Sequence, residues 1–228
     1  GDVFALSGLV ASTVIVSLLG LDEGTGVLGI VIGLLVTLAI TAPLFALLNG
    51  GIERVAYKPL RGAPRLSPLI TAVGVSFIIQ NVSLAIYGVD FESVPAFVPR
   101  TDAITIGEFA VQWNKLAVIL IVAPVLLALT WFVTSTKQGK AMRAVAQDTE
   151  ASAMMGIDVN RTISITFFLA GALAASAGIV YLLQFNMRYD TGFELGLIAF
   201  TAAVLGGIGN LAGAVVGAMA IGLVQAFN

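Results

Sequence analysis

Six runs of this chain contain no charged residue, and most are long enough to cross a lipid bilayer. They are Val3–Leu21, Gly24–Ile52, Leu66–Val89, Leu116–Thr136, Thr162–Met187 and Leu195–Asn228. A membrane-spanning α-helix needs about 20 consecutive apolar residues. The chain is 58% hydrophobic and only 11% charged, and a soluble protein of 228 residues could not bury that much apolar surface. The runs therefore predict an all-α polytopic membrane protein.

We expect about six to seven membrane segments in a single transmembrane domain over residues 1–228. The last run is irregular, because Leu195–Leu205 is too short to span and a glycine cluster, Gly206–Asn210, follows it. This pattern predicts two helical pieces, either a broken or re-entrant segment or a helix pair packed through Gly209, Gly213 and Gly217. The chain opens without Met and closes within an apolar run, so we expect a fragment truncated at both ends.

The positions of lysine and arginine predict the orientation. Eight of the 11 basic residues fall in two connections, 53–65 and 137–161, whereas the other three connections carry eight acidic residues. Basic loops are retained in the cytoplasm during insertion, so these two are expected inside the cell membrane and the others outside. The alternation of inside and outside holds along the whole chain.

The connection 90–115 is too long for a simple turn. Within it, apolar and polar residues alternate from Ile104 to Val111 around Gly107–Glu108. A glycine followed by another residue between alternating segments is typical of a type II′ hairpin. We expect a small extracytoplasmic β-hairpin here.

The residue composition excludes several kinds of chemistry. The chain has no cysteine and no histidine, so disulfides, zinc sites and histidine acid–base catalysis are excluded. No phosphate-binding G-x-x-x-x-G-K-[ST] motif occurs, so ATP is not expected to bind this chain. We predict no catalytic residue, no metal, no cofactor and no nucleic-acid partner, and we expect membrane lipid around the apolar runs.

A polar stripe marks one face of the run Leu66–Val89. Ser76, Gln80 and Ser83 recur at helical spacing, and polar side chains in a bilayer face other helices or a wet cavity. Interhelical hydrogen bonding and a substrate pathway explain this stripe equally well. The pathway hypothesis places substrate between the stripe and the broken segment, with Thr201, Gly206, Gly207, Gly209 and Asn210. Every charged residue is expected between the runs or at their edges, which leaves no mid-membrane charge to bind a zwitterion.

The connection 137–161 carries signals for a short helix of its own. Asp148 can cap a helix start, Glu150 lies in its first turn, and Gly156 stands where a helix end favours positive φ. A helix Thr149–Met155 is predicted, with Ala151, Met154 and Met155 toward one side. Small and flexible apolar side chains on an exposed helix suit docking into a groove of another protein.

The order Glu150-Ala151-Ser152-x-x-x-Gly156 resembles the Glu-Ala-Ala-x-x-x-Gly signature of ABC importer permeases. Gly1–Phe4, Ile52–Phe77, Gly139–Asp148 and Ala199–Asn210 resemble permeases of the high-affinity branched-chain amino-acid ABC transporters, in one register over nearly the whole chain. The resemblance implies a second related permease, two cytoplasmic ATPase subunits and an extracytoplasmic binding protein. It also implies that the loop couples to the ATPase, with these coupling residues: Arg143, Asp148, Glu150, Ala151, Met154, Met155 and Gly156.

Two other functions compete with import of branched-chain amino acids. Relatives of such permeases transport urea, short amides and other small metabolites. No residue of this chain indicates which substrate side chain is recognised. A channel-like protein without ATPase coupling is the alternative from a different class, although a cytoplasmic docking helix has no role in a channel. A proton-coupled carrier would normally place a carboxylate at mid-membrane.

Overall fold

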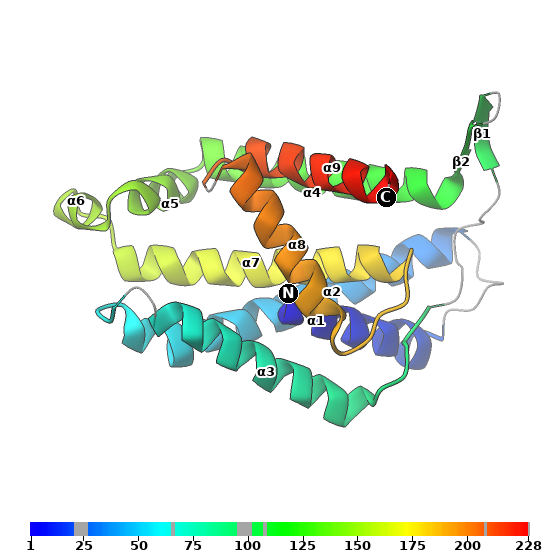
Figure 1. Cartoon of the computed structure of the whole chain (residues 1–228), viewed down its shortest axis with the longest axis horizontal. Helices are drawn as coiled ribbons and strands as arrows, with labels where there is room; N and C mark the ends of the chain where they lie inside the picture. The colour runs from blue at the N-terminus through cyan, green and yellow to red at the C-terminus, as the bar shows by residue number, and fades with distance from the viewer. Residues whose placement is uncertain (21–26, 65–66, 95–101, 107–108, 208, 228) are drawn as a thin grey trace.

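The structure, a computed structural model, describes residues 1–20, 27–64, 67–94, 102–106, 109–207 and 209–227. Nearly all of them are helical, and the helices lie side by side in an elongated bundle (Figure 1). The predicted helical class is therefore confirmed. Each apolar run became one helix or a pair of helices.

The helices follow the runs closely. The long ones are α2 (Val27–Ile52), α3 (Ser67–Tyr87), α4 (Trp113–Ser135) and α7 (Val159–Leu182). The shorter ones are α1 (Asp2–Thr13), α5 (Lys137–Gln147), α6 (Thr149–Met154), α8 (Thr191–Gly206) and α9 (Leu211–Phe227). Helix α1 continues as a π-helical turn, Val14–Leu18, and α2 is followed by the short turns Glu53–Tyr57 and Lys58–Leu60.

Helix α7 is the centre of the bundle, with α1 and α2 packed along it. Leu9 of α1 and Ile179 of α7 belong to one buried cluster, and Phe45 of α2 and Ala175 of α7 belong to another. Polar groups also join these helices, because Asn49 donates to the carbonyl of Phe167 at 2.7 Å. Side-chain hydrogen bonds between helices satisfy polar groups that lipid could not.

The two predicted cytoplasmic connections lie at one end of the bundle, and the hairpin lies at the other (Figure 1). At the first end, Arg61 donates to Asn160, which joins the connection 53–65 to the start of α7. At the opposite end, Glu92 and Met187 exchange backbone hydrogen bonds of 2.8 and 2.9 Å. Connections that the charge pattern assigns to the same side therefore meet in space.

Three described helical segments are long and apolar enough to span a membrane: Val31–Leu60, Ser67–Tyr87 and Val159–Leu182. A fourth is gained if Ile121–Ser135 and Lys137–Gln147, which meet at 75°, are taken as one broken span. The remaining apolar helices, Asp2–Leu18, Thr191–Gly206 and Leu211–Phe227, are shorter. The expected six to seven segments are thus not confirmed, because the first and last runs fold into three helices below spanning length.

The connection after α3 contains two antiparallel strands, β1 (Asp102–Ile106) and β2 (Phe109–Gln112), with Ile106 paired to Phe109. The expected strand pair is present over these residues. The predicted turn, Gly107–Glu108, lies outside the described residues. The side of the membrane on which this hairpin lies stays a prediction.

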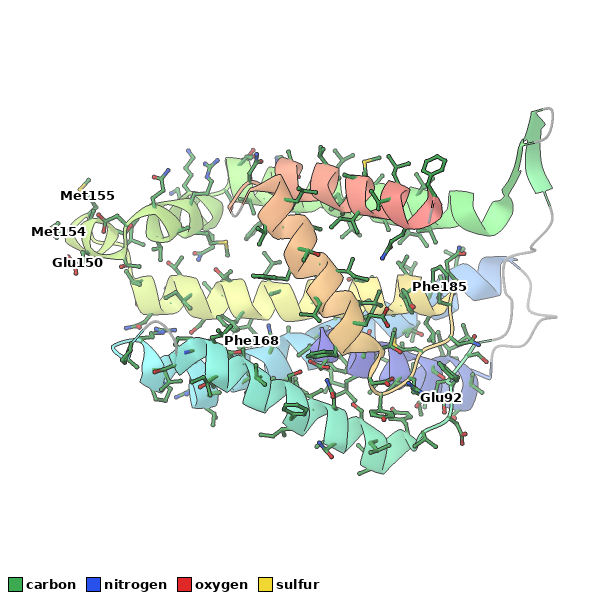
Figure 2. All side chains as sticks on the ribbon, viewed as in Figure 1. Glu92, Glu150, Met154, Met155, Phe168 and Phe185 are labelled. Carbon is green, nitrogen blue, oxygen red and sulfur yellow. The ribbon has the colours of Figure 1, made fainter. Side chains whose placement is uncertain are left out.

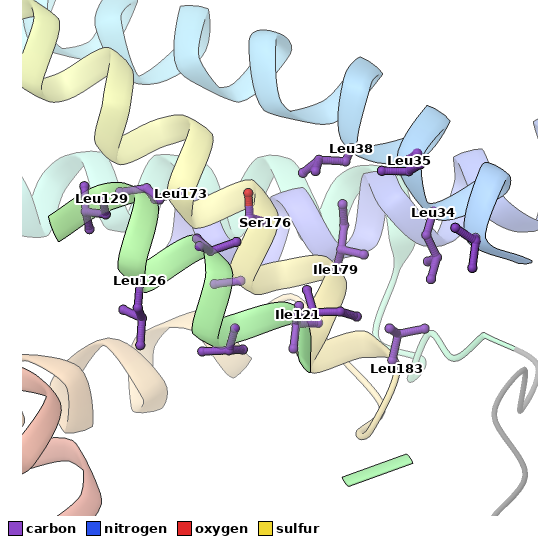
Figure 3. A pocket seen from close by; sticks show the side chains of 15 residues that line it. Leu34, Leu35, Leu38, Ile121, Leu126, Leu129, Leu173, Ser176, Ile179 and Leu183 are labelled. Carbon is purple, nitrogen blue, oxygen red and sulfur yellow. The ribbon is translucent and has the colours of Figure 1, made fainter. Parts of the chain in front are cut away.

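An apolar cavity of about 420 Å³ opens between α2, α4 and α7 (Figure 3). Leucine side chains such as Leu38, Leu126 and Leu173 line it, and Ser176 is its polar exception. The Ser176 hydroxyl is already bonded to the carbonyl of Ala172 at 3.0 Å. The cavity therefore offers no free polar group among the described lining residues, and it does not coincide with the predicted pathway.

Candidate functional site

The end of the molecule that carries residues 137–161 is built from two helices and not from one. The prediction was a single short helix after Asp148, but α5 precedes it, capped by Thr136, whose hydroxyl accepts from the Gly139 backbone N–H at 3.0 Å. The missed signal was this threonine before a polar, Gly-containing stretch. Because α5 leaves α4 at 75°, it carries α6 out beyond the bundle.

Helix α6 forms as predicted, one residue shorter than expected. The Asp148 carboxylate accepts from the backbone N–H groups of Glu150 and Ala151 at 2.9 and 3.0 Å. These bonds satisfy donors that an uncapped helix start leaves unpaired. Gly156 follows the helix with φ of +82°, so the predicted helix end is confirmed.

Met154, the last residue of α6, and Met155, which follows it, lie at the tip of the molecule next to Glu150 (Figure 2). Met154 is 83% exposed and Met155 is 82% exposed, whereas Ser152 of the same helix is buried against the protein. Arg143 lies on α5 and donates to the carbonyl of Thr134 at 3.3 Å. Of the predicted coupling residues, those of α6 therefore share one protruding tip, and Arg143 supports the α4–α5 bend.

An ion pair and two hydrogen bonds tie the connection 53–65 to the start of α7. Glu53 is 2% exposed and is paired with Arg61, and it also accepts from the Ser164 hydroxyl at 2.9 Å. Arg61 donates in addition to Asn160. The cluster joins the end of α2, the connection before α3 and the first turns of α7, and sequence patterning did not predict it.

The polar stripe of α3 faces a carboxylate. Asp2, 7% exposed, accepts from the Ser76 hydroxyl at 2.5 Å and from the Gln80 side-chain amide at 2.8 Å. Ser76 lies about 14 Å along α3 from Ser67, at the middle of this candidate span. The sequence placed Asp2 at the edge of its apolar run, whereas in the structure its carboxylate lies beside the middle of α3. Ser83 is buried and bonds only to the carbonyl of Ile79.

The glycine cluster forms the turn between α8 and α9. Gly207 and Gly209 have φ of +90° and +94°, and Asn210 accepts from the Gly213 N–H at 3.1 Å, which caps α9. The run 195–228 is thus two helices, as expected. Thr201 is exposed, and its hydroxyl bonds within its own helix.

The two helices pack backbone against backbone. A Cβ added to Gly213 would lie 1.9 Å from the Gly206 carbonyl oxygen, and one added to Gly217 would lie 2.3 Å from that of Ala202. At its other end α8 packs on α1, because a Cβ on Gly192 would lie 2.8 Å from the Asp2 Cα. Of the pathway residues, the structure brings Ser76 and Gln80 together at Asp2 and Gly206, Gly207, Gly209 and Asn210 at the α8–α9 turn.

An ion pair between Arg188 and Asp190 stabilises the connection from α7 to α8. Arg188 donates through Nε and a terminal nitrogen to both oxygens of Asp190, at 2.7 and 2.5 Å, and its guanidinium lies 5.1 Å from the Phe91 ring centre. The hydrogen bonds from Arg188 lower the pKa of Asp190 below its usual value. The same pair raises the pKa of Arg188.

Comparison with known proteins shows which family the sequence matches. A family model described as "Branched-chain amino acid transport system / permease component" matches residues 1–228. The chain is 31% identical to the high-affinity branched-chain amino acid transport system permease protein BraD of Pseudomonas aeruginosa and 33% identical to LivH of Escherichia coli. Each alignment covers 100% of this chain and 74% of the relative.

A more distant relative is named for a different import system. The autoinducer 2 import system permease protein LsrC of Klebsiella pneumoniae is 32% identical over 65% of this chain and 42% of its own length. No solved structure gives a significant match.

Proposed function

The chain belongs to the branched-chain amino acid transport permease family, and from that premise we propose that it is the transmembrane subunit of an ABC importer for branched-chain amino acids. It is a multi-pass protein of the cytoplasmic membrane and not itself an enzyme. ATP hydrolysis falls to two cytoplasmic ATPase subunits, and a second related permease completes the membrane part. An extracytoplasmic binding protein delivers the substrate.

The exposed tip of α6 carries this proposal. Met154 and Met155 are more than four-fifths exposed on a capped helix that protrudes from the bundle. Flexible apolar side chains on a protruding helix suit a groove on a soluble partner. A channel would need no such helix, which favours ATP-coupled import over the channel alternative.

We further propose the membrane topology. The connections 53–65 and 137–161 lie in the cytoplasm and the β-hairpin lies outside, in accord with the charge pattern and with the separation of these parts at opposite ends of the bundle. The three shorter apolar helices complete six to seven membrane segments with the four long ones. The proposed substrate pathway lies between the α3 stripe of Ser76, Gln80 and Ser83 and the segment Thr201–Asn210.

Reconstitution of the full-length permease with its ATPase subunits tests the coupling proposal. Replacing both Met154 and Met155 by Ala is expected to reduce co-purification of the ATPase and transport together, because the docking surface loses most of its apolar area. The matched control is Phe185→Ala, which removes a large exposed side chain at the opposite end of the molecule. Unchanged ATPase retention in the double methionine variant would refute docking at α6.

The substrate is tested on the cognate binding protein. Calorimetry across leucine, isoleucine, valine, urea and short amides should show tight binding of the aliphatic amino acids. An apolar pocket discriminates one methylene by only about 1–3 kcal/mol, so selectivity should follow the binding protein and not the permease. If the binding protein binds urea tightly and does not bind leucine, the proposed substrate is wrong and the assignment as an importer still holds.

A further inference from the structure

Asp2 is a buried carboxylate in the membrane part of the bundle. It is 7% exposed, and both of its described side-chain partners, Ser76 and Gln80, come from the middle of α3. Ionisable groups at this depth are costly and pair with one another or mark a substrate path. The burial of a carboxylate at this point therefore needs a physical explanation.

No described cation neutralises Asp2. Within the described ranges the ion pairs are Arg61–Glu53 and Arg188–Asp190, and neither includes Asp2. The hydroxyl of Ser76 and the amide of Gln80 are neutral donors, and each occupies one carboxylate oxygen. A carboxylate has about four lone-pair positions, so this one retains acceptor capacity for a cationic donor.

The position of Asp2 is also where three helices meet. Helix α1 packs against α3 and α8, and the first turn of α8 closes over Asp2 through the glycine contact at Gly192. Glycine presents backbone and no side chain there, so displacement of α8 would uncover Asp2 without any side chain having to be withdrawn. A site at Asp2 would therefore lie between α1, α3 and α8.

We propose that Asp2 binds the ammonium group of the substrate during passage, with Ser76 and Gln80 holding its carboxylate in place. This inference rests on the proposed function for the identity of the substrate as an amino acid. A charge-assisted N–H···O bond is stronger and shorter than a neutral one, which suits brief capture of a primary ammonium group. The site selects for the ammonium and leaves the side chain to the binding protein.

The test measures binding of a labelled amine to the full-length permease in its complete complex, without binding protein. Isoamylamine carries the leucine side chain and an ammonium group, and isocaproate carries a comparable side chain and a carboxylate. Wild type should bind isoamylamine at least about tenfold more tightly than isocaproate, a difference of about 1.4 kcal/mol. Asp2→Asn should remove that preference, and Asp2→Glu, which keeps the charge, should retain part of it.

The matched control is Asn81→Leu, because Asn81 is the next residue of α3 after Gln80, is exposed and bonds only to its own helix. It should keep the amine preference of wild type. An unchanged preference in Asp2→Asn, or a loss in Asp2→Glu as complete as in Asp2→Asn, would overturn the site. Leucine uptake is measured in parallel with wild type. If the amine binds in a manner that depends on Asp2 but leucine is not taken up, the proposed substrate is refuted and the site stands. If leucine is taken up but amine binding does not depend on Asp2, the site is refuted and the proposed substrate stands.

Discussion

Gly156 ends α6 with φ of +82° in open space, so its requirement for glycine is conformational and not steric. An alanine there would cost about 1–2 kcal/mol, because its Cβ crowds the backbone in the left-handed region. Gly156→Ala should weaken coupling, and Gly156→Val should uncouple transport from ATP hydrolysis while insertion stays intact. The measurement is the ratio of substrate transported to ATP hydrolysed.

Gly51 is the matched control for this substitution. It lies in helical conformation and also has nothing within 4 Å of an added Cβ. Gly51→Ala should leave coupling unchanged, since alanine is favoured over glycine in a helix. Equal coupling in Gly156→Val and wild type would mean that α6 does not dock.

Glu53 is the second residue at which a single change has a clear physical cost. Glu53→Gln removes one partner of a buried ion pair and leaves the Arg61 charge uncompensated. We expect a loss of about 2 kcal/mol in stability, below that of a fully buried pair, because Arg61 is 23% exposed and water screens part of its charge. Thermal unfolding of the purified protein measures it.

The double variant Glu53→Gln with Arg61→Gln supplies the control. If the cost of the single change comes from an unpaired buried charge, removal of both charges should recover part of the stability. A double variant less stable than the sum of both single changes would contradict that cause.

At the scale of secondary structure, the α8–α9 pair depends on glycines that allow the two backbones to touch. Gly213→Ala would place a methyl group 1.9 Å from the Gly206 carbonyl oxygen. Overpacking of this kind costs about 1–3 kcal/mol, so the variant should lower the unfolding temperature and reduce transport. Gly222→Ala is the control on the same helix, because an added Cβ there meets nothing within 4 Å. Equal stability of the two variants would show that α8 and α9 do not pack this closely.

For the whole molecule, the arrangement of the connections predicts which residues face each side of the membrane. The chain has no native cysteine, so single substitutions report accessibility without background. Met154→Cys should react with a membrane-impermeant thiol reagent only from the cytoplasm, and Phe91→Cys, 61% exposed in wild type, only from outside. Reaction of both from the same side would refute the proposed topology.

The amino-acid sequence by itself predicts the helical membrane class, the two ends of the bundle and the docking helix. Charge-free runs of spanning length leave helices as the only backbone that satisfies its hydrogen bonds in lipid. The short helix after Asp148 is equally local, because its cap and its glycine end depend on neighbours within eight residues along the chain. Interactions between near neighbours can be predicted without knowledge of the fold.

The Asp2 cluster and the Glu53–Arg61 network depend on the tertiary structure. Asp2 stands next to a charge-free run and therefore reads as an edge residue, yet its partner Ser76 is 74 positions away along the chain. Ser164 lies 111 positions from Glu53. The helix that packs beside a given residue is set by contacts between distant segments and not by the periodicity of one run. For this reason the sequence predicted the polar face of α3, and only the assembled bundle decided that this face meets a carboxylate.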